Sequence, residues 1–243
     1  MNHVLFEPAW PDSLRPFAPS SRAPIPAAGQ EAPRTRVLLV HGLGRTARSM
    51  RALARFMSAQ GFEVWSLNYP SRSADAQTLA DQHLAPALRF LSADNRPTHI
   101  VSHSLGGILA RLAFAKMAPI AGTRLVMLAP PNAGSEIVDR LGNWRVFRWL
   151  LGPAALQLGS NPQSIPQSLP PVPDSVPCAV IAGTRSGDPW FNSFFDGLHD
   201  GKVSLASARL PPPCVCVEVR ATHTFLMNHP AARRSIADFL AAA

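Results

Sequence analysis

The sequence predicts an α/β fold built on a doubly wound, mostly parallel sheet of about six strands. Short apolar runs, which suit strands buried on both faces, alternate along the chain with helical patterns. Strands separated by helices form right-handed β-α-β units, which give a parallel sheet covered on both faces. The chain has 243 residues, of which 47% are hydrophobic, enough for one sizeable core.

Local sequence features predict where each strand and helix begins and ends. The first strand, 37–40, is fully apolar, and the helix predicted at 47–60 stops at Gly61. A strand at 62–67 precedes a helix at about 74–93, in which Pro86 is expected to cause a kink. The final helix, 230–241, has proline in its first turn. The remaining strands are expected at 98–101, 125–128, 178–181 and 214–219, with a helix running from the segment 102–107 to about Met117.

Proline is enriched, at 25 of 243 residues, and most of the excess lies in two patches. Residues 1–35 are rich in Pro, Ala and Ser without periodicity, which predicts an N-terminal arm, lying over the surface or partly disordered. We expect one folded domain to occupy residues 36–243. The second patch, between Pro153 and Pro177, ends a region at 135–177 that we interpret as a small helical cap or lid.

The formal net charge is +8, but no motif accompanies it that would read a nucleic acid, so we expect no nucleic-acid partner. The densest basic run, Arg45, Arg48, Arg51 and Arg55, has helical spacing and is best explained as a solvated helix face. Attraction to an anionic lipid or an acidic substrate is the alternative. The sequence contains no apolar run of 18 residues, so we expect no transmembrane helix. The N-terminus lacks a signal-peptide pattern. These features favour a cytoplasmic protein, although a secreted chain trimmed of its signal would look the same.

Ser104 is the candidate nucleophile. It lies between a short apolar strand and a helix, with Ser102 two residues before it and Gly106 and Gly107 behind it. A sharp strand-to-helix turn needs small residues two positions either side of the nucleophile. The pattern is S-x-S-x-G rather than the usual G-x-S-x-G. The alternative is an ordinary N-cap serine followed by flexible glycines.

Backbone donors for an oxyanion are predicted at two turns. The sequence His41-Gly42-Leu43-Gly44 ends the first strand, where the N–H of Leu43 is available. The N–H of Leu105, at the start of the helix after Ser104, is the second candidate, because the helix dipole there favours negative charge. A plain strand–helix turn is the alternative reading of the glycine-rich segment.

A base and an acid should follow the serine in the order Ser, Asp, His. His223 follows the last strand, whereas His229 precedes Pro230 and is better explained as the entry to the final helix. Three aspartates follow the strand at 178–181, namely Asp188, Asp196 and Asp200. We favour Asp200, which opens a tight glycine turn, over Asp188, with His223 as the general base.

Five segments together resemble the α/β-hydrolase superfamily, and within it the bacterial lipase/esterase branch. They are H-G-L-G at 41–44, S-H-S-L-G-G at 102–107, P-N-A-G-S at 131–135, D-G-K-V-S at 200–204 and T-H-T-F at 222–225. The resemblance covers about residues 36–243. It implies Ser104 as nucleophile, Asp200 as acid, His223 as base, and Leu43 and Leu105 as oxyanion donors. No Asp lies two residues after His223, where calcium-binding lipases of this group place a ligand, so no structural calcium is expected.

The predicted activity is hydrolysis of a carboxylic ester, of a small molecule or a lipid, through an acyl-enzyme and without cofactor or metal. An acyltransferase or thioesterase with the same triad, and a catalytically silent lipid-binding or partner-binding protein of the same fold, are the alternatives. Two apolar stretches, 144–151 and 190–195, are expected to supply the substrate pocket, although burial in the core is the default interpretation. The pocket candidates are Trp144, Trp149, Trp190 and Phe194. His3, His83, His99, His103 and His199 have no metal-ligand spacing.

Overall fold

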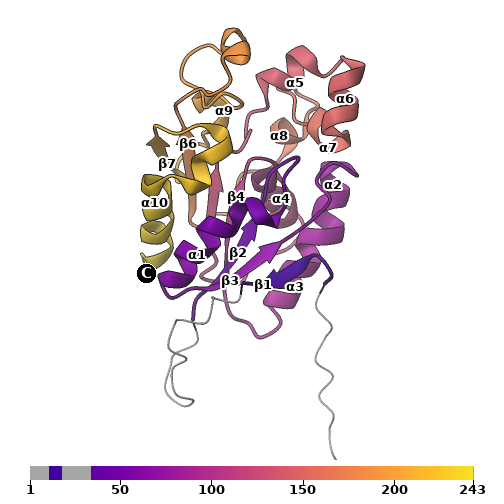
Figure 1. Cartoon of the computed structure of the whole chain (residues 1–243). Helices are drawn as coiled ribbons and strands as arrows, with labels where there is room; N and C mark the ends of the chain where they lie inside the picture. The colour runs from indigo at the N-terminus through magenta and orange to yellow at the C-terminus, as the bar shows by residue number, and fades with distance from the viewer. Residues whose placement is uncertain (1–10, 18–33, 243) are drawn as a thin grey trace, which may run out of the picture.

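The computed structural model describes residues 11–17 and 34–242, and its centre is a seven-stranded sheet (Figure 1). The strand order is β1-β3-β2-β4-β5-β6-β7, and every neighbouring pair is parallel except β1 with β3. The strands are β1 (Leu14–Pro16), β2 (Arg36–Val40), β3 (Glu63–Leu67), β4 (Thr98–His103), β5 (Leu125–Leu128), β6 (Cys178–Gly183) and β7 (Val215–Val219). The mostly parallel doubly wound sheet predicted from the sequence is confirmed.

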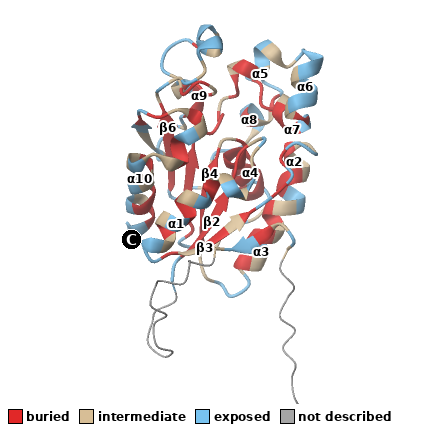
Figure 2. Cartoon of the chain, viewed as in Figure 1, coloured by how far each residue is buried: buried red, intermediate tan, exposed pale blue. Residues whose placement is uncertain are grey.

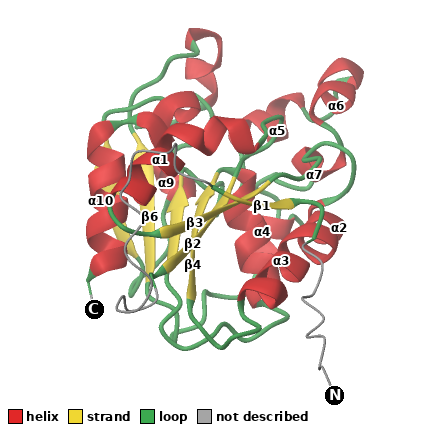
Figure 3. Ribbon diagram, turned by 60° about the horizontal axis from the view of Figure 1, so that its bottom comes forward, coloured by secondary structure: helices red, strands yellow, loops and turns green. Residues whose placement is uncertain are grey.

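Helices cover both faces of the sheet, as Figure 3 shows. On one face lie α1 (Arg51–Ala59) and α10 (Pro230–Ala241), and on the other lie α2 (Ala76–Leu79), α3 (Ala85–Leu91) and α4 (Leu105–Phe114). Along β2, Leu38 and Val40 join the core beneath α4, whereas Val37 and Leu39 join the core beneath α1 and α10. This alternation follows from the two-residue period of a strand, and it explains why residues 37–40 are all apolar.

The prediction of an arm without regular structure at residues 1–35 is wrong for Leu14–Pro16. This segment forms β1, the antiparallel edge strand beside β3, and Leu14 is completely buried. Proline is compatible with this position because an edge strand leaves one row of its backbone groups unpaired. The rest of the predicted arm, residues 1–10 and 18–33, lies outside the described residues.

The helix predicted at 74–93 forms, and it changes its winding before Pro86. The α2 helix passes through a π-helical turn, Ala80–Leu84, into α3. Proline has no N–H to donate and its ring crowds the preceding turn, so a wider turn at this point accommodates it. The last helix begins at Pro230 as predicted, and the side chain of His229 caps it by accepting a hydrogen bond from the N–H of Ala231 (3.3 Å).

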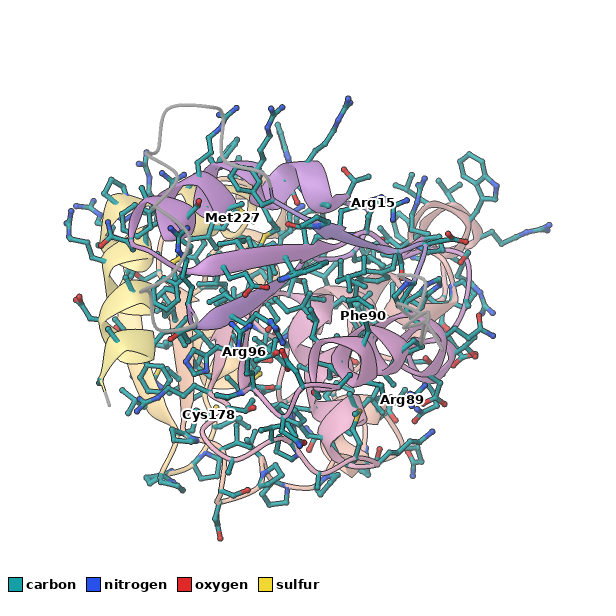
Figure 4. The ribbon with its side chains drawn as sticks, turned by 90° about the horizontal axis from the view of Figure 1, so that it is seen from below. Arg15, Arg89, Phe90, Arg96, Cys178 and Met227 are labelled. Carbon is teal, nitrogen blue, oxygen red and sulfur yellow. The ribbon has the colours of Figure 1, made fainter. Side chains whose placement is uncertain are left out.

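The two ends of the parallel strands differ in chemistry. At the amino ends, which face the viewer in Figure 4, Arg36 and Arg96 both pair with Glu63 and Asp94. At the carboxyl ends, four short helices after β5 rise above the sheet, and η3 (Pro189–Phe194) and α9 (Leu205–Ala208) lie beside them (Figure 1). These four helices are α5 (Glu136–Leu141), α6 (Arg145–Leu151), α7 (Pro153–Leu156) and α8 (Ile165–Ser168). Among the described residues no helix is long and apolar enough to cross a membrane.

Candidate active site

Ser104 occupies the turn between β4 and α4 in a strained backbone conformation. Its φ is +52° and its ψ is −122°, which is unusual for a residue with a side chain. Its own N–H donates to the carbonyl of Leu128 on the neighbouring strand (2.8 Å), which fixes the turn against β5. Strain of this kind, at the junction of a strand and a helix, is typical of a nucleophile elbow.

Small residues on both sides of Ser104 make this turn possible. Ser102 is completely buried between the strands, and its hydroxyl donates to the carbonyl of Val126 (3.3 Å). A Cβ atom at Gly106 would stand 2.8 Å from the carbonyl oxygen of Val40, closer than real Cβ contacts. The structure therefore meets the packing requirement with serine in place of the usual first glycine.

Asp200 and His223 are joined by a buried hydrogen bond. Nδ1 of His223 lies 2.8 Å from Oδ2 of Asp200, and the main-chain N–H of His223 donates to the carbonyl of Asp200 (3.0 Å). The other carboxylate oxygen accepts from the main-chain N–H groups of Lys202 (3.0 Å) and Val203 (2.8 Å). A Cβ at Gly183 would stand 2.7 Å from the Cβ of Asp200, so glycine at the end of β6 admits this loop. The carboxylate thus fixes which ring nitrogen of His223 carries hydrogen.

The structure separates the favoured residues from their rivals. Asp188 directly precedes η3 and lies half-exposed in a different depression, and Asp196 is exposed. Neither forms a hydrogen bond or ion pair with His223 in the described part of the chain. His229 caps α10, as expected from its position before Pro230.

His103, which sequence reasoning set aside, contacts the candidate base directly. Its Nε2 lies 3.0 Å from the carbonyl of His223 and donates to it, and the two rings lie 4.7 Å apart, centroid to centroid. Its Nδ1 is buried and has no hydrogen-bond partner among the residues that the structure describes. Burial, and after it the nearby charge of His223, lowers the pKa of His103 well below its usual range, so the ring stays neutral. The sequence feature that could have indicated this role is the position of His103 directly before Ser104, the candidate nucleophile.

His41 holds the glycine-rich turn after β2. Its Nδ1 donates to the carbonyl of Gly42 (2.9 Å), its Nε2 accepts from the N–H of Tyr69 (3.3 Å), and the rings of His41 and Tyr69 stack. Burial lowers the pKa of His41 to about 4 and raises that of Tyr69. Both rings are therefore neutral, and they support the turn without charge.

Because several histidines are buried, we expect the folded protein to lose stability in mild acid. Burial lowers the pKa of His41 and of His99 to about 4, and that of His103 also falls, whereas each is 6.5 without burial. Below pH 6.5 the unfolded chain binds more protons than the folded one. We expect the free energy of unfolding in urea to fall from pH 6.5 towards pH 4, by up to about 1.4 kcal/mol per pH unit for each histidine. An unchanged value between pH 7 and pH 5 would contradict this burial.

The two predicted oxyanion donors lie at turns beside Ser104. Leu105 is the first residue of α4, and Leu43 lines the same cavity as Ser104. Among the described residues, the main-chain N–H groups of Leu43 and Leu105 form no hydrogen bond within the protein. Two unpaired donors beside the serine suit a developing negative charge.

Ser104 and His223 open into one cavity of about 330 Å³. Three of the four short helices after β5, namely α5, α6 and α7, supply much of its wall, and Phe191 of η3 adds to it. The apolar part of the wall consists of Leu43, Pro131, Ile137, Val138, Phe147, Leu150, Leu151, Ala155, Leu158, Phe191 and Val203.

The pocket residues predicted from the sequence are wrong, although the two stretches are the right ones. Trp144, Trp149 and Trp190 are 65%, 83% and 78% exposed, and neither they nor Phe194 line the cavity that contains Ser104. Their neighbours line it instead. On α6, residues 147, 150 and 151 share one face because they are three and four residues apart, and that face turns to the cavity. The outer surface of α6 is exposed in Figure 2.

A strained serine at a strand–helix elbow and a buried Asp–His pair, both on loops at the carboxyl ends of parallel strands, define the class of α/β hydrolases. Residues 37–236 match the model of the alpha/beta hydrolase family, and the chain belongs to this family. A search of curated protein sequences finds no match.

Solved structures with the same fold include several lipases and esterases. A mature lipase from Bacillus licheniformis is 21% identical, with a TM-score of 0.71, and the match covers 93% of this chain and 97% of that one. A phospholipase from Legionella pneumophila is 18% identical over 87% of this chain and 60% of its own, with a TM-score of 0.65. A metagenomic carboxyl esterase is 19% identical over 82% and 69% of the two chains, with a TM-score of 0.64. At these identities the likeness shows the fold.

Proposed function

We propose that this α/β hydrolase cleaves carboxylic esters through Ser104, His223 and Asp200. The observation that carries the proposal is the buried hydrogen bond between Asp200 and His223 in a cavity that also contains Ser104. The proposal is supported by structural neighbours that are a lipase and a carboxyl esterase. The basic test is hydrolysis of p-nitrophenyl esters by the purified protein, with loss of turnover after treatment with a fluorophosphonate.

The proposed mechanism starts from the tautomer that Asp200 selects. With hydrogen on Nδ1, the Nε2 of His223 is free to accept a proton. It takes the hydroxyl proton of Ser104 while the Ser104 oxygen bonds to the ester carbonyl carbon. The N–H groups of Leu43 and Leu105 stabilise the oxyanion. His223 then protonates the leaving alcohol, the ester C–O bond breaks, and an acyl-enzyme remains. Water, deprotonated by the same histidine, attacks the acyl carbon. His223 then returns this proton to the oxygen of Ser104 as the acyl C–O bond breaks and the acid leaves.

We also propose that residues 135–177 cap the site, because three short helices in this region, α5, α6 and α7, carry apolar side chains into the cavity wall. Phe147 is the largest side chain that α6 contributes to that wall. Phe147→Ala removes a ring from the cavity, so we expect the preferred acyl chain to lengthen. The measurement is kcat/KM across p-nitrophenyl esters from acetate to dodecanoate.

Trp149→Ala is the matched control, because Trp149 lies on the same helix but outside this cavity. We expect it to leave the chain-length optimum in place. A shift of the optimum in Trp149→Ala but not in Phe147→Ala would show that the acyl chain binds elsewhere.

A further inference from the structure

Two cationic side chains, Arg45 and Lys202, line the cavity that contains Ser104. Arg45 follows the glycine-rich turn after β2, and its main-chain N–H donates to the carbonyl of Gly42 (3.3 Å). Lys202 follows Asp200 by two residues and donates its main-chain N–H to that carboxylate (3.0 Å). The two cations therefore come from the loops that carry a proposed oxyanion donor and the proposed acid.

Neither cation has a counter-ion in the described part of the chain. No ion pair reaches the side chain of Arg45 or Lys202, and no Asp or Glu lines the cavity. Both side chains are half-buried among apolar neighbours. A cation that has lost part of its hydration without gaining a partner carries a free-energy cost, and an anion that binds beside it offsets this cost.

The other lysine and the other arginines of the same basic run differ from these two cations. Lys116, the other of the two lysines, is exposed and pairs with Asp81 (2.8 Å). In the basic run that begins with Arg45, the residues Arg48, Arg51 and Arg55 are exposed, as a solvated helix face requires. Arg45 alone of this run lines the cavity. Among the causes that lower the pKa of His103, burial is the largest, His223 is the next, and the positive charge of Arg45 is smaller. This effect is consistent with a position of Arg45 near the strand–helix turn at Ser104.

We propose that Arg45 and Lys202 bind an oxyanion group, a phosphate or a carboxylate, carried by the ester substrate. A guanidinium donates two parallel hydrogen bonds to either group, and an ammonium adds a compact charge. The acyl chain has the apolar wall around Phe147 and Leu151. This inference rests on the proposed ester hydrolysis, and it names the class of ester: an acyl ester with a fixed negative charge.

The test compares esters that differ in charge and remain monomeric in solution. Hexanoylglycerol is neutral, hexanoylglycerol phosphate carries a phosphate, and the hexanoyl ester of glyceric acid carries a carboxylate. We expect kcat/KM for one of the charged esters to exceed that for hexanoylglycerol by about tenfold or more, mainly through KM, because the anion contact is made in the ground state as well. The charged ester that is preferred identifies the anion.

The variants are read through the ratio of kcat/KM for the charged ester to that for hexanoylglycerol, which cancels general changes in the site. We expect Arg45→Gln and Lys202→Met each to lower this ratio several-fold and the double variant to bring it near one. Arg48→Gln and Lys116→Met remove comparable charges outside the cavity and should keep the parent ratio.

Three results would overturn the inference: a parent ratio near one, a preference that survives in the double variant, or a preference seen only on vesicles that contain anionic lipid. The last result would assign the charges to attachment at a membrane surface. Binding of hexyl glyceryl ether phosphate and of the uncharged ether, measured by calorimetry, tests the anion site without hydrolysis. If no ester is cleaved, the proposed function fails, while preferential binding of the charged ether would still support the anion site.

Discussion

Replacement of Ser104 by alanine is expected to lower kcat for p-nitrophenyl butyrate on the order of 10⁴-fold or more, because no other group forms the acyl-enzyme. KM should change much less, since the serine hydroxyl contributes little to binding the apolar acyl chain. The residual rate would come from the oxyanion donors and from binding. The measurement is steady-state hydrolysis by purified protein, with active sites counted by the release of nitrophenol in the first turnover.

Ser102→Ala is the matched control for this experiment. Ser102 is completely buried two residues earlier and donates its hydroxyl to the carbonyl of Val126. Both variants lose one hydroxyl on the same strand–helix unit, but only Ser104 opens into the cavity. If Ser104→Ala hydrolysed the ester as fast as the parent protein, the proposed nucleophile would be wrong.

Replacement of Asp200 by asparagine is expected to lower kcat about 10³- to 10⁴-fold, through the wrong tautomer of His223. The asparagine carbonyl would keep the two main-chain hydrogen bonds that Oδ1 of Asp200 now accepts from Lys202 and Val203. Its NH₂ group would then face Nδ1 of His223, where Oδ2 now lies. A donor at this place moves the ring hydrogen to Nε2, which then cannot accept the proton of Ser104.

The matched variant is Asp188→Asn, at the rival position in the same connection between β6 and β7. Asp188 lies half-exposed in another depression and forms no hydrogen bond with His223, so we expect its loss to change kcat less than about threefold. The reverse result, a large loss in Asp188→Asn and full activity in Asp200→Asn, would assign the acid to Asp188. Circular dichroism of both variants separates this loss from unfolding.

The fold followed from the sequence because its signals are local. Each central strand is a short apolar run and each long helix has an amphipathic or capped pattern, so the order of elements is readable without knowledge of contacts. The strand β1 was missed because three residues carry no period: Leu14 is buried, whereas Arg15 and Pro16 are exposed. Only its pairing with β3 makes it a strand.

The site was predictable where a residue type and a strand end coincide, as at Ser104 and His223. The choice between Asp200 and Asp188 depends on how the connection after β6 folds back, which no local pattern records. The prediction of the pocket residues was wrong for a related reason. The helix α6 is apolar on several sides, with Val146, Phe147, Trp149 and Leu151 close together, so its sequence does not reveal which face turns inward.

The most direct measurement of the central claim locates the covalent bond. The parent protein, Ser104→Ala and Asp200→Asn are treated with a fluorophosphonate, digested, and examined by mass spectrometry. We predict one modified residue, Ser104, in the parent protein, slow modification of the same residue in Asp200→Asn, and none in Ser104→Ala. Modification of a different residue, or an unmodified parent protein that still hydrolyses esters, would contradict the assignment of Ser104 as the nucleophile.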